Sequence, residues 1–370
     1  MYERLISSII NNSLKANIKG RRIMISVFGF AASPLVGELS QEIVRLGGTP
    51  EISYEDAREK RIFLDTADES QIRKRSALYR ERVSKCQANI RIFAEADLFA
   101  LTGANKENLK LYNKLYGEIR EDIVLKGDWV LLNFPTSAYS TAARMPLEEY
   151  GVLWKKVTSL DYSKMKRAMT PLKDIMEKTD RVHIKGPGTD LEFSIRSMPA
   201  ILCTGECNIP DGEIFSAPIR NSVNGVVQFN TPLIASTIQT QFENIRLEFK
   251  DGRIVSSHSS KNDASLKDFL DADEGARYTG EFALGVNPYI TSPLGDILFD
   301  EKISGSFHIA AGRCYDECNN KNRSTNHFDM ICVQTPEYGG GEIFFDGKLI
   351  RKDGRFTIPE LESLNPENLI

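Results

Sequence analysis

The stretch RIMISVFGFAASPLVGELSQEIVRLGGTPEISY, residues 22–54, decides how the first half of the chain is interpreted. It opens with a short apolar run at 22–28, continues with apolar residues at helical spacing over 36–46, and returns to a strand-like run at 49–54. The pair Gly47-Gly48 is typical of a helix end. A strand, a helix and a strand within about 35 residues form a βαβ unit, so we expect parallel strands here.

The alternation continues outward from this stretch and then changes character. A basic helix is predicted at 70–85, further strands at 97–102 (DLFALT) and 128–134 (DWVLLNF), and helical structure over 146–178. Beyond it, 181–195 is typical of a hairpin, and turn dipeptides recur at 224–225, 251–252, 346–347 and 353–354. The expected fold is an α/β N-terminal domain with parallel-type βα units over 1–180, followed by a β-rich α+β domain over 181–370.

Composition excludes several classes of protein. Among the 370 residues, 47 Lys and Arg nearly balance 51 Asp and Glu, which argues against a nucleic-acid partner. No apolar run approaches the roughly 20 residues of a membrane-spanning helix, so no membrane partner is expected. Neither G-x-G-x-x-G nor a phosphate loop occurs.

Two features of the sequence bear on the cellular location of the protein and on the oxidation state of its cysteines. Residues 15–22 are basic and precede the apolar stretch 23–37, an order that mimics a signal peptide. That order starts late, after an amphipathic segment, so we interpret 23–37 as a buried strand and its loop. The six cysteines include two four-residue spacings, 203/207 and 314/318, which could hold a structural zinc but lack the usual spacing. Reduced thiols in a cytoplasmic protein are the expectation.

Ionisable residues of metal-binding type gather in the second half. His308 follows a strand-like entry, and His327-x-Asp329 places two ligand types on one face of a strand. Glu213 and Glu281 each follow a glycine at the start of an apolar run, and a buried acid needs a cation or hydrogen bonds. Two Glu, two His and one Asp suit two divalent ions sharing a carboxylate better than one tetrahedral structural zinc. His183 and His258 are interpreted as hydrogen-bonded structural residues.

Four ordered motifs carry a family resemblance. NIPDGEIFSAP (208–218), GEFALGVNP (280–288), DEKISGSFHIAAGRCY (300–315) and NRSTNHFDMI (322–331) resemble the thermophilic aminopeptidase family of metallopeptidases, M29. KGPGTDLEFSI (185–195) resembles the entry into the catalytic domain of that family. The first half resembles the family only in its α/β pattern.

The resemblance implies a metal-binding catalytic domain and a function. It implies two divalent ions per chain, zinc, cobalt or similar, with the ligands Glu213, Glu281, His308, His327 and Asp329. It also implies that Tyr315 is the active-site tyrosine, a donor to the oxyanion, and that Glu301 is a ligand or a supporting acid that moves the water proton. Hydrolysis of the N-terminal residue from short peptides, in the closed chamber of a homodimer, is the implied activity.

The sequence also departs from the family and leaves alternatives open. Residues 316–326 read DECNNKNRSTN where the family is glycine-rich, which affects the substrate preference. Exposed-looking apolar positions between 285 and 300 give the homodimer weak support. A metal-dependent amidohydrolase acting on non-peptide amides and a catalytically silent metal-binding scaffold are the alternatives. Tyr315 is the feature that distinguishes an enzyme from the scaffold, because a structural metal site needs ligands but no additional hydrogen-bond donor.

Overall fold

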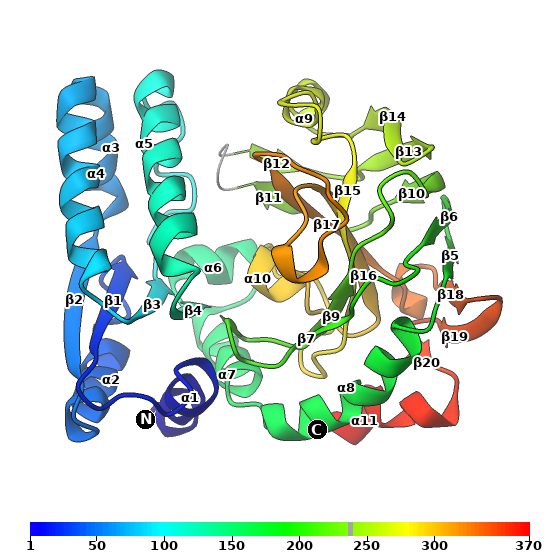
Figure 1. The fold of residues 1–370 in the computed structure, drawn as a ribbon, viewed down its shortest axis with the longest axis horizontal. Coiled ribbons are helices and arrows are strands. Elements are labelled where there is room, and N and C mark those ends of the chain that lie inside the picture. The colour runs from blue at the N-terminus through cyan, green and yellow to red at the C-terminus, as the bar shows by residue number, and fades with distance from the viewer. Residues whose placement is uncertain (236–239) are drawn as a thin grey trace. The chain divides into compact units, whose positions relative to one another are not determined.

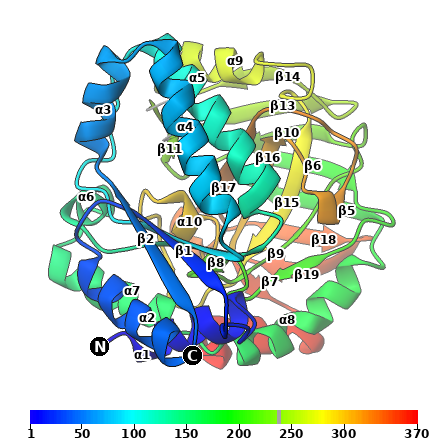
Figure 2. The same ribbon diagram turned by 60° about the vertical axis from the view of Figure 1, so that its left-hand side comes forward.

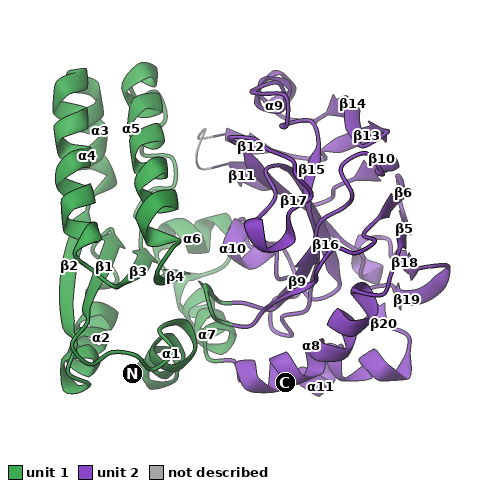
Figure 3. Cartoon of the chain, viewed as in Figure 1, with its two compact units in different colours: residues 1–159, 205–210, 236–239 green, residues 160–204, 211–235, 240–370 purple. Residues whose placement is uncertain are grey.

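The structure, a computed structural model, describes residues 1–235 and 240–370 and divides into two compact units (Figure 3). The described residues of the first unit are Met1–Ser159 and Gly205–Pro210. Those of the second are Leu160–Thr204, Asp211–Ala235 and Thr240–Ile370. The predicted domains 1–180 and 181–370 stay a prediction, since compact units in one structure do not test independent folding.

The first unit is built on a parallel sheet in the strand order β2-β1-β3-β4-β8 (Figure 1). The central strands bury apolar side chains on both faces, as parallel strands covered by helices do. The strands are β1 (Arg22–Phe28), β2 (Thr49–Glu55), β3 (Ala88–Phe93), β4 (Asp128–Asn133) and β8 (Asn208–Ile209).

Local signals in the sequence define the helices of the first unit. Asp68 and Gln71 form a reciprocal capping box at the start of α4, and Asp56 caps α3. Helices α4 and α5 run side by side in both views (Figures 1 and 2). The helices are α1 (Glu3–Ser8), α2 (Ser33–Arg45), α3 (Ala57–Thr66), α4 (Glu69–Ser84), α5 (Lys106–Ile119), α6 (Ser137–Ala142) and α7 (Leu147–Thr158), with π-helical turns at Ile9–Ser13 and Arg120–Val124.

One predicted strand of this unit is wrong. Residues 97–102 form turns, and the strand lies just before them at Ala88–Phe93. The Asp97 carboxylate accepts a hydrogen bond from the Phe99 N–H, so it directs the backbone into a turn. The apolar residues of DLFALT suggested a strand and did not indicate that the Asp97 side chain would bind the backbone N–H of Phe99.

The second unit is mainly antiparallel. Its larger sheet has the order β14-β13-β10-β6-β5-β18-β19-β20, a smaller sheet has the order β17-β16-β15-β9-β7, and β11 pairs with β12. The strands of the larger sheet are β5 (Arg181–Gly186), β6 (Thr189–Ser194), β10 (Asn224–Gln228), β13 (Arg246–Lys250), β14 (Arg253–His258), β18 (Glu342–Phe345), β19 (Lys348–Lys352) and β20 (Arg355–Phe356). The others are β7 (Ile201–Cys203), β9 (Glu213–Ser216), β15 (Thr279–Gly285), β16 (Ser306–Gly312), β17 (His327–Val333), β11 (Leu233–Ala235) and β12 (Thr240–Phe242).

Helical segments precede, connect or follow these strands. They are α8 (Tyr162–Met176), α9 (Asp263–Leu270), α10 (Ile297–Asp300) and α11 (Pro366–Leu369), with 3₁₀ helices at Asp316–Cys318, Pro336–Tyr338 and Pro359–Leu364. The predicted fold class is confirmed: parallel βα units come first, and a β-rich region with antiparallel sheets follows. Among the described residues, none of the helices has the length and apolar character that crossing a bilayer requires.

Two smaller predictions for the second unit are wrong. Asn224-Gly225 begins β10 rather than forming a hairpin turn, and a Cβ on Gly225 would lie 2.1 Å from the Asp190 carbonyl oxygen. The glycine therefore allows a close approach between strands. Most apolar residues between 285 and 300 are buried, with Val286, Ile290 and Phe299 each at most 1% exposed, while Tyr289 and Ile297 are partly exposed, so the stretch presents little apolar surface.

Candidate metal centre

Neighbouring strands of the smaller sheet carry the residues that the sequence singled out. Glu213 begins β9, Glu281 lies in β15, His308 in β16, and His327 and Asp329 in β17 (Figure 1). The register puts all five on one face, because direct cross-strand partners and residues two apart share a face. We call these five residues the candidate metal centre.

Small residues fill the positions between them. Ala310 lies directly opposite both Glu281 and Asp329, Ala283 lies opposite His308, and Gly285 lies opposite Glu213. Larger side chains there would occupy the space above the sheet. The alternation of ionisable and small residues therefore leaves room for ligand atoms to converge.

The five side chains form two groups that share Glu281. His308 Nε2 lies 3.3 Å from Oε1 of Glu281 and 3.5 Å from Oε2 of Glu213. His327 Nε2 lies 3.3 Å from the other Glu281 oxygen, Oε2, and 3.2 Å from Oδ1 of Asp329. In each group, one ligand atom per residue lies within 4.8 Å of the others. Each group could hold one metal ion, with Glu281 offering one oxygen to each.

The orientation of His327 is set by a backbone carbonyl. Its Nδ1 donates to the Arg313 carbonyl oxygen at 2.7 Å, which leaves Nε2 to face the carboxylates. A Cβ on Gly280 would lie 2.2 Å from that same oxygen, so only glycine lets Arg313 approach β15 here. This accounts for the glycine that precedes Glu281.

The five side chains by themselves are short of positive charge. A neutral His327 that donates through Nδ1 presents an Nε2 lone pair to two carboxylates, so a proton or a metal ion must lie between them. Burial would lower the pKa of His308, but the hydrogen bond to Glu281 and the charges of Glu213 and Glu281 raise it to about 9. Burial would raise the pKa of Asp329, yet the adjacent His327 holds it well below its usual range. The donor set therefore fits divalent ions, which would take the place of these protons.

Lys302 and Asp211 belong to the same buried cluster but were missed by the sequence analysis. Lys302 Nζ lies 2.8 Å from Oε1 of Glu213, forms an ion pair with Glu301, and lies 3.9 Å from Oδ1 of Asp211. Burial alone would lower the pKa of Lys302, but these carboxylates raise it. The available signal was the charged run 300–302 before an apolar strand, and an acid two residues before Glu213.

Glu301 and Tyr315 lie at the edge of this cluster. Glu301 follows α10, and burial raises its pKa to about 8 although Lys302 opposes the shift. The Tyr315 ring lies against His327, with 4.8 Å between ring centroids. The charge of His327 would lower the pKa of Tyr315, but burial and the carboxylates of Glu281 and Asp329 raise it. The hydroxyl therefore keeps its proton at neutral pH.

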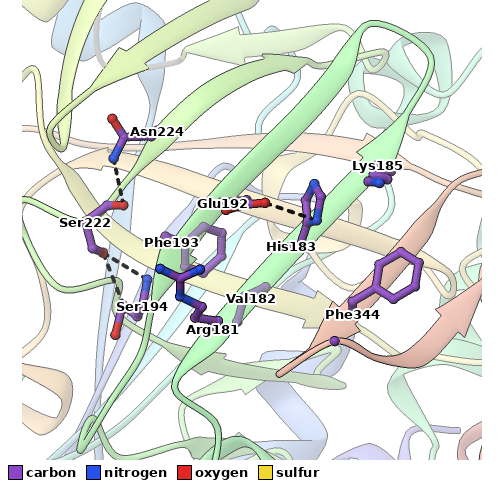
Figure 4. A pocket seen from close by; sticks show the side chains of 11 residues that line it. Arg181, Val182, His183, Lys185, Glu192, Phe193, Ser194, Ser222, Asn224 and Phe344 are labelled. Carbon is purple, nitrogen blue, oxygen red and sulfur yellow. Dashed lines mark hydrogen bonds and ion pairs between the residues drawn. The ribbon is translucent and has the colours of Figure 1, made fainter.

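A groove of about 600 Å³ lies elsewhere, over β5, β6 and β18 of the larger sheet (Figure 4). The described residues that line it include none of the seven predicted site residues. His183 lies in this groove, 2.6 Å from Oδ1 of Asp190 and 3.3 Å from Oε1 of Glu192. His258 lies 3.4 Å from Asp263, and the structural role predicted for both histidines stays a prediction.

Comparison with known proteins gives a family match along nearly the whole chain. The profile of the family described as Thermophilic metalloprotease (M29) matches residues 4–356. In the solved structures, the wild-type AmpT of Thermus thermophilus is similar, with a TM-score of 0.77 over 97% of this chain and 100% of that chain. At 23% identity, this likeness shows a shared fold.

Curated relatives match over shorter stretches. Aminopeptidase T of Thermus thermophilus is 37% identical over 151 residues, which cover 37% of this chain and 36% of that protein. Aminopeptidase AmpS of Bacillus subtilis is 33% identical over 150 residues, which cover 36% of this chain and 35% of that protein. The chain thus matches about a third of the length of these curated relatives.

Proposed function

This chain belongs to the thermophilic metalloprotease family M29, and from that premise we propose that it is a metal-dependent aminopeptidase that removes the N-terminal residue from short peptides. The observation that carries the proposal is the pair of buried ligand groups that share Glu281. A shared carboxylate with mixed oxygen and nitrogen ligands suits a catalytic pair of divalent ions, and these groups supply both.

Charge balance supports two ions per chain. The cluster contains one ammonium, that of Lys302, and five carboxylates, those of Asp211, Glu213, Glu281, Glu301 and Asp329. Bound divalent ions would favour the ionised form of all five carboxylates; with both histidines neutral, the formal charge is then minus four, which two divalent cations balance. Imidazole and carboxylate ligands suit zinc or cobalt.

The residues around the ions would divide the chemistry. When bound, the ions supply an activated water and polarise the scissile carbonyl. Glu301, which lies beside Lys302 and whose pKa is raised by burial, is proposed as the acid–base group. Tyr315 keeps its proton and is proposed to donate a hydrogen bond to the oxyanion.

The finer predictions remain part of the proposal. A homodimer with a closed chamber rests on the family resemblance, because the apolar residues at 285–300 no longer support it. A cytoplasmic location is proposed because none of the six cysteines, all within the described residues, forms a disulfide.

Hydrolysis of leucine p-nitroanilide, with and without a chelator, tests the proposal. We expect cleavage that the chelator abolishes and added zinc or cobalt restores, and no cleavage of the N-acetylated substrate. Equal cleavage of both substrates would instead indicate a general amidohydrolase. No cleavage of either by metal-loaded protein would indicate a scaffold and overturn the proposal.

A further inference from the structure

Lys302 lies within a third group of ligand-type side chains, beside the two already described. Cys203, Asp211 and Glu213 offer atoms that lie within 4.8 Å of one another. The Lys302 side chain is fully buried, and its Nζ contacts Glu213 at 2.8 Å and lies 3.9 Å from Asp211. The ammonium thus lies where a cation bound by this group would compensate the same charges.

We propose that Lys302 is a positioning residue that takes the place of a third cation: its ammonium keeps metal away from Cys203, Asp211 and Glu213 and turns the second oxygen of Glu213 toward His308. The inference rests on the proposed function and deepens it. According to this inference, Lys302 is the residue that limits the chain to two metal ions.

The division of the Glu213 carboxylate supports this role. Oε1 accepts a hydrogen bond from Lys302, while Oε2 is buried, lacks a hydrogen-bond partner among the described residues, and lies 3.5 Å from His308 Nε2. A buried acceptor without a donor is costly, so this oxygen is poised for a ligand that the protein itself does not provide. By holding one oxygen, Lys302 fixes the orientation of the carboxylate and directs the other oxygen toward His308.

Electrostatic repulsion explains how the Lys302 ammonium keeps a metal ion out of the third group. A thiol with two carboxylates is an attractive donor set for zinc or cobalt. A divalent ion placed beside a buried ammonium would be repelled strongly, because interactions between charges are weakly screened in the protein interior. Removal of the ammonium therefore removes the barrier and leaves the acids short of a cation.

Cobalt(II) titration of the full chain tests the proposal, because a cobalt–thiolate bond adds a charge-transfer band in the near ultraviolet. For the natural chain, we expect about two ions and no thiolate band. For Lys302→Met, which keeps the volume of the side chain, we expect about three ions, a thiolate band and, by chelator competition, on the order of tenfold weaker binding at the first two positions. Cys203→Ser added to Lys302→Met should abolish the band.

The matched control is Lys267→Met, which removes the exposed partner of Asp263 in the same unit and should leave cobalt binding unchanged. Lys302→Gln, which keeps a neutral donor but loses the charge, is the second variant and should also gain the band. Both Lys302 variants are purified with cobalt, and circular dichroism checks their folding.

Three results would overturn the proposal. They are a thiolate band in the natural chain, an unchanged two-ion titration in both Lys302 variants, and failure of both variants to fold even with cobalt. In the last case the ammonium serves stability alone. A natural chain that binds no cobalt would overturn the proposed function instead, which keeps the two failures apart.

Discussion

The parallel sheet of the first unit and the smaller antiparallel sheet of the second both bury their central strands, but with different side chains. The middle of β1 is filled by Ile23, Ile25 and Val27. Every residue of β15 and β16 is buried as well, yet these strands include Glu281 and His308. Apolar burial stabilises a fold, whereas burial of ionisable groups costs free energy unless partners compensate it. The difference indicates that the side chains of the first sheet stabilise the fold, whereas the second sheet buries ionisable side chains that lower stability but can bind metal and take part in catalysis.

The largest effect is expected at the shared carboxylate. Glu281→Ala removes an oxygen from both ligand groups, so both ions should be lost. Activity should fall by on the order of a thousandfold or more, about 4 kcal/mol. Elemental analysis after dialysis measures the metal, and Glu248→Ala on the exposed side of β13 is the control. One ion retained at full affinity would contradict the shared role.

The next effect concerns the parallel sheet and should be confined to stability. Ile25 is fully buried in β1, so Ile25→Ala leaves a cavity and should lower the free energy of unfolding by about 3.5 kcal/mol. Urea unfolding measures this loss. Cobalt stoichiometry of the folded variant should not change. A loss of cobalt from the folded protein would mean that the two sheets are less separate in role than their side chains indicate.

A slightly smaller effect is expected for a residue that acts without binding metal. Tyr315→Phe removes one hydroxyl and keeps the ring beside His327. If the hydroxyl stabilises the oxyanion, kcat should fall on the order of a hundredfold, about 3 kcal/mol, with unchanged metal content. His308→Ala should instead lose metal and activity together. Full activity in the Phe variant would remove Tyr315 from the mechanism and leave the metal centre intact.

The smallest effect is a pH dependence of the free energy of unfolding, and it arises from Asp273, which holds the segment before β17. Asp273 accepts hydrogen bonds from the backbone of Gly275, Ala276 and Thr325 and from the Ser324 and Thr325 hydroxyls. Burial would raise its pKa, but these donors lower it. Because the unfolded pKa is about 3.9, the stabilisation is complete above about pH 5 and is lost as the pH falls through the lower folded value.

Asp273→Asn isolates this contribution. The variant should lose about 2 kcal/mol of unfolding free energy at pH 7, and the difference from the natural chain should shrink steadily below pH 4. Urea unfolding across this pH range measures it. A difference that stays constant with pH would mean that shape, rather than charge, anchors the segment before β17.

Much of the fold was predictable because its signals are local. Helical spacing over 36–46 and the glycine pair after it indicate α2 and its end, and β1 and β2 follow on either side. The turns at Asp251-Gly252 and Asp346-Gly347 have the left-handed backbone that these dipeptides favour. The predictions for two segments were wrong. At 97–102 a side-chain hydrogen bond from the Phe99 N–H to Asp97 sets the conformation, and at Asn224-Gly225 a close contact between strands sets it.

The candidate site was predictable where spacing along one strand reports a shared face, as in His327-x-Asp329. It was not predictable where partners come from distant segments. Lys302 and Glu213 are 89 positions apart, and only the folded sheet places them in contact. No local pattern distinguishes a buried lysine of this kind from one at the surface.

Ala310 gives the metal centre a built-in magnetic probe. Its methyl group is directly opposite both Glu281 and Asp329 on the face of the sheet that carries the ligands. A paramagnetic ion held by these carboxylates would shift and broaden the resonance of that methyl in a protein labelled with ¹³C-methyl alanine. The order in which the two ions load could thus be followed in solution, without substrate and without substitution.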